Sequence, residues 1–210
     1  MTILFDLDGT LIDSTEAILE SFHNSFDIFK MSHPSDEAIK SLIGHPLDVM
    51  YATLGVEDEK VWDMVDAYKE HYRKISTQKT QLLPFAAEAI ELAAQHARLG
   101  IVTTKTGRYS KVLMEHFSLM HHFEVLIGRE DVQHPKPHPE PIYKAIEFLK
   151  VQKENCWMIG DTRMDLIAAK EAGIKSVAVV SEYEPLEELK KYTNIIKTNA
   201  LEAVQTILNR

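Results

Sequence analysis

The N-terminal stretch Thr2-Ile-Leu-Phe-Asp-Leu-Asp-Gly-Thr-Leu-Ile-Asp13 joins a short apolar run to two closely spaced carboxylates. The apolar run predicts a buried strand that begins at Ile3. Asp6 and Asp8 follow it two residues apart, so on an extended chain their side chains leave the same face. The next pair, Gly9-Thr10, permits a tight turn whose backbone N–H groups can hold an anion. Carboxylates beside such a turn indicate a divalent cation that holds a phosphate.

The composition is that of a globular protein. The chain has 210 residues, of which 45% are hydrophobic, enough for the core of one domain or of a large and a small one. A net charge of −9 argues against a nucleic-acid surface, because phosphate backbones are bound mainly by clustered Lys and Arg. The only cysteine, Cys156, excludes an internal disulfide framework.

The sequence also predicts where the protein works and what it binds. No apolar run approaches the roughly 20 residues that a membrane helix needs, and no signal peptide precedes the first strand. We therefore expect a soluble cytoplasmic protein. The expected oligomeric state is a monomer or a homodimer. Its expected partner is a small phosphorylated metabolite, with neither nucleic acid nor membrane involved.

Residues 14–83 have a helical pattern and contain no convincing strand. Asp13 or Ser14 can begin the first helix, with Asp13 and Glu16 at the spacing of a capping box. One apolar stripe at helical spacing comprises Val61, Val65, Tyr68, Tyr72 and Ile75. We expect residues 14–83 to form a helical cap domain, inserted into a core domain that consists of residues 1–13 and 84–210.

From residue 84 onward, strand and helix patterns alternate. Further strands are expected at residues 99–103, 123–127, 156–159 and 176–180. Helices are expected near residues 86–98, 107–119, 139–150 and 163–172, and two more end the chain. Apolar strands that alternate with helices are typical of a parallel sheet covered on both faces. The predicted fold class is α/β, with a Rossmann-like three-layer α/β/α core and an inserted α-helical cap.

Polar residues follow several of the predicted strands. Thr103-Thr104-Lys105 ends the second strand, Lys136 lies on the loop after the third, and Gly160-Asp-Thr-Arg-Met-Asp165 ends the fourth. Ligands of such sheets bind beyond the carboxyl ends of the strands, so these residues can converge on Asp6. The convergence favours a phosphate site over the simpler alternative, in which Asp, Gly and Thr merely form a turn.

These motifs resemble those of the haloacid dehalogenase superfamily of phosphohydrolases. The Asp-x-Asp-Gly-Thr signature, a strand-end Thr, a Lys followed by Pro and Gly-Asp-Thr-x-x-Asp occur in the family's order between residues 6 and 165. The helical interval lies where that family has its helical cap. Within the superfamily, the motifs are most similar to those of the phosphoglycolate phosphatase-like group.

The resemblance implies a role for each motif residue. Asp6 would be the nucleophile that forms an aspartyl-phosphate, and Asp8 would be the general acid and base. The resemblance implies that Mg²⁺ is held by the carboxylates of Asp6 and Asp161 and the backbone carbonyl of Asp8. Asp165 would accept hydrogen bonds from metal-bound waters, although capping of a helix is an alternative for Asp161 and Asp165. The phosphate would be held by Gly9, Thr10, Thr103, Thr104 and Lys136.

Substrate choice is expected to depend on the cap and on residues near it. His45, in Gly44-His-Pro-Leu47, is a candidate for a substrate contact, and Lys105 is a candidate for binding a substrate carboxylate. Thr104 and Phe85 depart from the phosphoglycolate-like pattern, which often has Asn and Gly there. The predicted function is a Mg²⁺-dependent phosphatase of small phosphomonoesters, with phosphoglycolate as the first candidate. Alternatives are a pyrophosphatase, a β-phosphoglucomutase-like phosphosugar mutase and a scaffold without catalysis.

Overall fold

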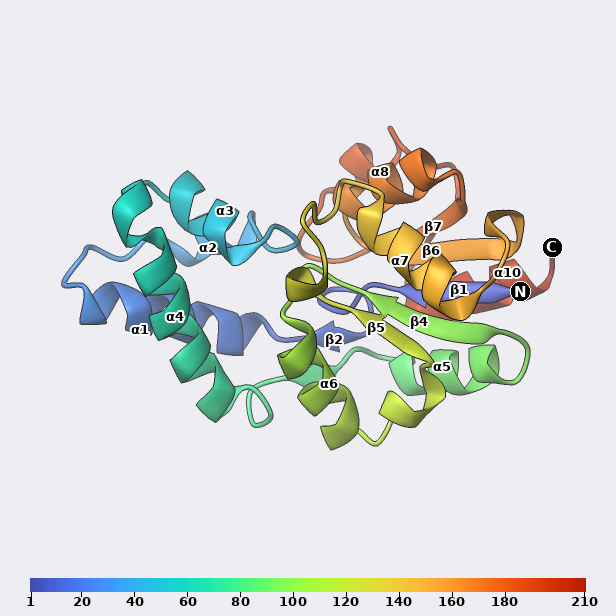
Figure 1. Cartoon of the computed structure of the whole chain (residues 1–210), viewed down its shortest axis with the longest axis horizontal. Coiled ribbons are helices and arrows are strands. Elements are labelled where there is room, and N and C mark those ends of the chain that lie inside the picture. The colour runs from blue at the N-terminus through green and yellow to red at the C-terminus, as the bar shows by residue number, and fades with distance from the viewer.

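A six-stranded parallel sheet forms the centre of the larger lobe in this computed structural model, which describes residues 1–210 (Figure 1). The strand order is β5-β4-β1-β6-β7-β8. The strands are β1 (Thr2–Phe5), β4 (Arg98–Val102), β5 (Val125–Ile127), β6 (Cys156–Gly160), β7 (Lys175–Val179) and β8 (Ile196–Lys197). The two-residue β8 was not predicted, because so short a strand has no alternation to detect.

Helices cover both faces of the sheet, which confirms the predicted three-layer α/β/α class. Ile3 and Phe5 point into an apolar core shared with α5 (Ala86–Ala94), α6 (Gly107–His116) and α10 (Ala200–Leu208). Leu4 points the other way, toward α7 (Glu140–Leu149) and α8 (Arg163–Ala172). The remaining short helices are α9 (Leu186–Leu189) and the 3₁₀ turns Met120–His122, Arg129–Asp131 and Lys153–Asn155.

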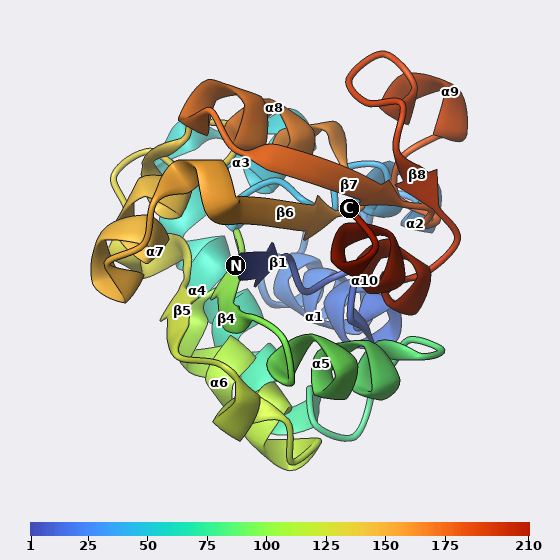
Figure 2. The same ribbon diagram turned by 90° about the vertical axis from the view of Figure 1, so that its right-hand side faces the viewer.

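A second, helical lobe lies beyond the carboxyl ends of the strands. It contains α1 (Thr15–Ile28), α2 (Asp36–Lys40), α3 (Leu47–Thr53) and α4 (Asp58–Ile75). Its core combines aliphatic and aromatic side chains. The Phe22 ring lies 4.7 Å from Tyr51 and 5.1 Å from Tyr68, measured between ring centroids. Both chain termini lie at the opposite end of the sheet (Figures 1 and 2). None of the helices combines the length and the apolar character that crossing a bilayer requires.

The junction between the lobes differs from the prediction in two respects. β2 (Ile12–Asp13) pairs antiparallel with β3 (Gln81–Leu82), so a short strand does occur between residues 14 and 83. The predicted capping box of Asp13 and Glu16 does not form, because Asp13 accepts from Thr15 N and Glu16 pairs with Lys79. A local contact of Asp13 and a long-range ion pair of Glu16 thus take the place of the predicted capping box.

Candidate active site

Asp6 lies at the carboxyl end of β1, in the middle of the sheet. Phe5, the residue before it, is in register with Ile101 on one side and Ile159 on the other. The polar residues that follow β4 and β6 therefore lie beside Asp6, as the sequence predicts. Asp6 is buried, and this burial raises the pKa of its carboxyl to about 7 although the ammonium of Lys136 acts in the opposite direction.

Lys136 joins two of the predicted site carboxylates. Its Nζ lies 2.9 Å from Asp6 Oδ1 and donates to Asp165 Oδ1 at 2.5 Å and to the Val102 carbonyl at 3.0 Å. Burial by itself would lower the pKa of Lys136, but Asp165 and Asp6 raise it overall, so the side chain is a cation at neutral pH. The structure therefore places a fixed positive charge beside the candidate nucleophile.

Asp161 and Asp165 begin the segment after β6 and have different surroundings. Asp165 forms a capping box with Thr162 at the start of α8, and its Oδ2 accepts from the Thr162 hydroxyl at 2.9 Å. Asp161 Oδ1 accepts from Thr10 Oγ1 at 2.9 Å, whereas Asp161 Oδ2 is buried without a hydrogen-bond donor. Burial raises the pKa of Asp161 well above its ordinary value, and the nearby carboxylates of Asp165 and Asp6 add to this effect.

The carboxylates fit a hard divalent cation. Asp6, Asp161 and Asp165 each offer an oxygen, and these oxygens lie within 4.8 Å of one another. Apart from the ion pair with Lys136, Asp6 Oδ1 has no partner, and Asp161 Oδ2 has none at all. Buried carboxylate oxygens in that state are costly without a cation, and oxygen ligands are those that Mg²⁺ prefers. Both oxygens of Asp165 are already engaged, so Asp6 and Asp161 fit best as direct ligands.

The turn after β1 brings the backbone close to Asp161. Gly9 has φ +79°, and a Cβ at this position would lie 2.1 Å from Asp161 Oδ2. Only glycine fits both the conformation and the space. The Gly9 and Thr10 amides donate to the carbonyls of Ile12 and Leu7, which corrects the prediction that these two N–H groups form an anion nest.

Asp8 is held beside Asp6 by two neighbours. Lys105 Nζ lies 3.0 and 3.1 Å from its two carboxylate oxygens, and the hydroxyl of Ser14 donates to Oδ1. Burial acts to lower the pKa of Lys105, but Asp8 and Tyr72 more than compensate, so the net direction is upward. Lys105 also lies over the ring of Tyr72 on α4, 4.7 Å from the centroid, and so touches the helical lobe.

The two threonines after β4 have different environments. Thr103 is buried beside the carboxylates, and its hydroxyl accepts from Lys105 N, which leaves the hydroxyl proton available for a ligand. The hydroxyl of Thr104 donates to the carbonyl of Gly44 at 2.9 Å. Thr104 therefore connects the core to the cap loop, and its part in phosphate binding stays a prediction.

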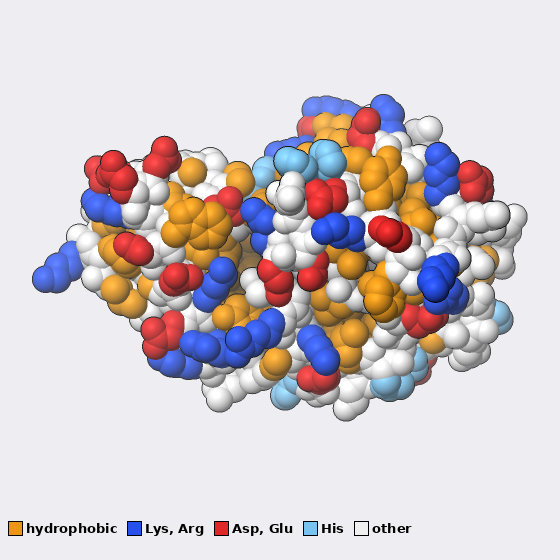
Figure 3. Space-filling view, viewed as in Figure 1, with side chains coloured by type: hydrophobic (Ala, Val, Ile, Leu, Met, Phe, Trp, Pro, Cys, Tyr) orange, Lys and Arg blue, Asp and Glu red, His pale blue; other side chains and the backbone are white.

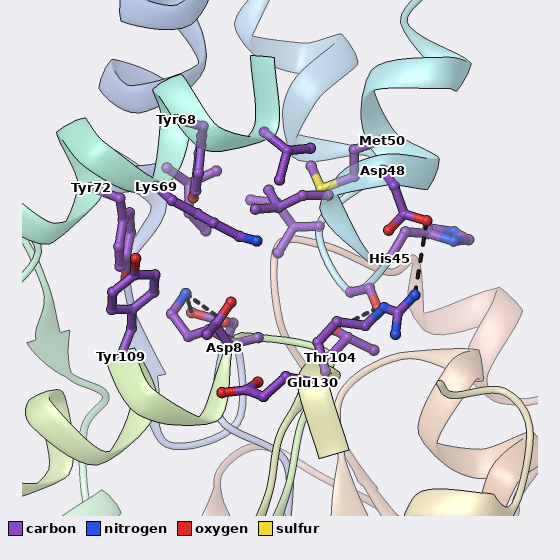
Figure 4. Close-up of a pocket in the computed structure, with 18 of the residues that line it drawn as sticks. Asp8, His45, Asp48, Met50, Tyr68, Lys69, Tyr72, Thr104, Tyr109 and Glu130 are labelled. Atoms are coloured by element: carbon purple, nitrogen blue, oxygen red, sulfur yellow. Dashed lines mark hydrogen bonds and ion pairs between the residues drawn. The ribbon is translucent and has the colours of Figure 1, made fainter. Parts of the chain in front are cut away.

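A cavity of about 370 Å³ opens between the lobes next to Asp8. The surface is hollowed where the helical lobe meets the sheet lobe (Figure 3). Tyr68 and Tyr72 of α4 and Tyr109 of α6 line one side, and His45 and Asp48 lie on the other (Figure 4). Burial lowers the pKa of His45, aided by Arg163 and opposed by Glu184. The predicted candidates His45 and Lys105 thus both line this cavity, while their role in specificity is untested.

Several residues near the site were not singled out from the sequence, and three of them are informative. Ser14 contacts Asp8, and Lys69 and Tyr109 line the cavity. Lys69 is the residue after Tyr68, which belongs to the predicted apolar stripe of α4. This position next to the stripe was the only sequence feature that could have pointed to Lys69. Ser14 and Tyr109 carried no signal beyond helix initiation and helix composition.

Comparison with known proteins agrees with this geometry. The sequence profile of the haloacid dehalogenase-like hydrolases matches residues 3–179. The pyrophosphatase PpaX of Bacillus cereus is 33% identical over 179 residues, which are 85% of this chain and 82% of that protein. The chain belongs to the haloacid dehalogenase-like hydrolases, which confirms the family predicted from the motifs.

Solved structures give the same fold. A predicted phosphatase from Clostridium acetobutylicum superposes with a TM-score of 0.90 at 26% identity, covering 100% of this chain and 98% of that one. A predicted phosphoglycolate phosphatase from Haemophilus somnus has a TM-score of 0.88 at 22% identity, covering 98% and 96%. At the latter identity the likeness concerns the fold alone.

Proposed function

We propose that the protein is a Mg²⁺-dependent phosphatase that hydrolyses a small phosphomonoester through an aspartyl-phosphate on Asp6. The observation that carries the proposal is the pair of buried carboxylates, Asp6 and Asp161, each with an oxygen that no hydrogen bond satisfies. Asp6 lies 2.9 Å from the ammonium of Lys136, and Asp8, two residues further along the chain, lines the cavity between the two lobes. A cation and a phosphoryl group together would complete this arrangement.

Each step of the proposed reaction has a candidate residue. A carboxylate oxygen of Asp6 attacks phosphorus while Asp8 gives a proton to the leaving alcohol oxygen. Water then attacks the phosphorus of the aspartyl-phosphate, Asp8 takes the proton from that water, and Asp6 and inorganic phosphate are released. The hydroxyl of Thr103 and the ammonium of Lys136 would hold the phosphoryl oxygens throughout.

The metal and the pairing of Asp8 complete the proposed site. Mg²⁺, when bound by the Asp6 and Asp161 carboxylates and the Asp8 carbonyl, would neutralise charge on the transferring phosphoryl group. The Asp8 carboxylate faces Lys105 in this structure, so its proton-transfer role requires it to turn toward the leaving oxygen. Until it turns, the ion pair with Lys105 holds the Asp8 carboxylate close to the site.

There are two candidate substrates for this site. The apolar and aromatic wall of the cavity favours an organic leaving group, and phosphoglycolate is the first candidate. Inorganic pyrophosphate is the second candidate, because the Bacillus cereus relative at 33% identity is named a pyrophosphatase.

The proposal is tested by phosphate release from phenyl phosphate, phosphoglycolate and pyrophosphate, each with Mg²⁺ and with chelator. We expect Mg²⁺-dependent release from at least one of them, abolished in Asp6→Asn and retained in Asp13→Asn, a matched change at the exposed end of β2. Rapid quenching of the wild type in acid should trap phosphate on Asp6. Equal release by Asp6→Asn, or no Mg²⁺-dependent release from any of the three compounds, would reject the proposal.

A further inference from the structure

The cavity between the lobes is mostly apolar but carries several charges. Ile18, Val65 and Met50 contribute aliphatic surface from the helical lobe. Its volume of about 370 Å³ exceeds that of a bare phosphate, so a leaving group of several heavy atoms has room beside Asp8. The charged residues of the lining therefore decide which leaving groups fit.

Every acidic residue of this lining already has a partner. Asp8 is paired with Lys105, and Asp48 lies 3.9 Å from Arg129 (Figure 4). Glu130 accepts hydrogen bonds from the backbone N–H groups that begin α6, at 2.8 and 3.1 Å. A bound anion would therefore meet no free carboxylate in this cavity.

Lys69 is the cation of the helical lobe that lines the cavity and has no ion-pair partner. Its ammonium group projects from α4 into the cavity, across from Asp8 (Figure 4). Other lysines of α4 pair along the surface: Lys60 with Glu57 and Lys74 with Glu70. Asp66 precedes Lys69 by three residues, the spacing of Glu57 and Lys60, but Asp66 and Lys69 do not pair, because the Lys69 side chain turns into the cavity. The structure thus leaves one positive charge of the cap facing the cavity.

We propose that Lys69 is a specificity-determining residue that binds a second anionic group, a carboxylate or a phosphate, at the far end of the leaving group. This inference rests on the proposed function, since it concerns the substrate of the same site. The substrate class is an organic phosphomonoester with a short apolar spacer and a distal anion. The scissile phosphate lies at Asp6, the spacer lies against the tyrosines of α4 and the distal anion pairs with Lys69.

Binding of non-hydrolysable phosphonates tests this assignment without turnover. Alkyl phosphonates and ω-carboxyalkyl phosphonates of equal chain length are titrated calorimetrically into the wild type, Lys69→Met, Lys69→Arg and the control Lys74→Met, all with Mg²⁺. At the best chain length, the wild type should prefer the carboxylated ligand by about tenfold, as expected for a charged hydrogen bond partly open to water. Lys69→Met should lose this preference, while Lys69→Arg and Lys74→Met should keep it.

Two results would overturn the assignment of Lys69. One is a wild type without preference at any chain length. The other is a preference that survives in Lys69→Met but disappears in Arg108→Met, because Arg108 of α6 is a second cation in the cavity lining. Hydrolysis of phenyl phosphate, which has no distal anion, is measured in parallel for the wild type and for the surface control Lys74→Met, and the two rates should be equal. Absence of that hydrolysis with an intact binding preference would reject the proposed phosphatase and leave the Lys69 assignment standing.

Discussion

Replacing Lys136 by Met tests how the site is held together. The change removes the ammonium that contacts Asp6 Oδ1 at 2.9 Å and donates to Asp165 Oδ1 at 2.5 Å, while the chain length of the side chain is kept. Lys136 is only 2% exposed, so water cannot replace it. Breaking a buried ion pair from one side typically costs about 3–5 kcal/mol, because a buried charge is left uncompensated.

This loss should be visible in urea unfolding. With a slope of about 2.5 kcal/mol per M urea, the midpoint should fall by about 1–2 M at pH 8. Lys144→Met is the matched control: its partner Glu140 lies 3.4 Å away at the surface, so the free energy of unfolding should change by about 0.5 kcal/mol or less. A change in Lys136→Met no larger than in this control would refute the reasoning.

The effect of Lys136→Met should also depend on pH. The folded protein raises the pKa of Asp6 to about 7, so its proton is bound more tightly in the folded chain than in the unfolded one. The cost of ionising Asp6 is absent below its unfolded pKa of about 4 and complete above about pH 7. Without Lys136 that cost grows, so the variant should lose more stability at pH 8 than at pH 5. A larger loss at pH 5 would contradict this sign.

Three further substitutions have defined outcomes. Gly9→Ala places a Cβ 2.1 Å from Asp161 Oδ2, and displacing that carboxylate should reduce kcat by about a hundredfold in a steady-state assay; a kcat unchanged within error would contradict it. Thr104→Val removes the hydrogen bond to the Gly44 carbonyl, so KM should rise about fivefold and hydrogen exchange in the cap loop should quicken. Asp8→Asn should lower turnover by about 10²–10⁴-fold with an unchanged circular dichroism spectrum; normal turnover would exclude Asp8 as the acid.

Much of the fold follows from local pattern, while several contacts do not. The apolar run of β1 and the span of α8, residues 163–172, were predicted because burial and helical spacing leave direct marks in the sequence. β3 and β8 were missed because strands of two residues exist only through their pairing partners. An element can be predicted when its own residues carry the pattern, and it is missed when it depends on a strand elsewhere in the chain.

The same distinction applies to the site. Asp6, Asp161 and Lys136 were placed together by reasoning from strand ends, and the structure brings them together. The pairing of Lys105 with Asp8 could not be read from spacing, because the two residues are 97 positions apart and Lys105 could equally face a substrate. The inward turn of Lys69 depends on how α4 packs over the cavity, which no local pattern records.

Binding of Mg²⁺ is the central claim, and calorimetric titration of the metal into the wild type, Asp6→Asn, Asp161→Asn and the exposed control Asp13→Asn tests it most directly. The account predicts one Mg²⁺ site in the wild type and in the control, weakened at least about tenfold in each of the other two variants. Equal Mg²⁺ affinity in all four proteins, or no binding to the wild type, would contradict it.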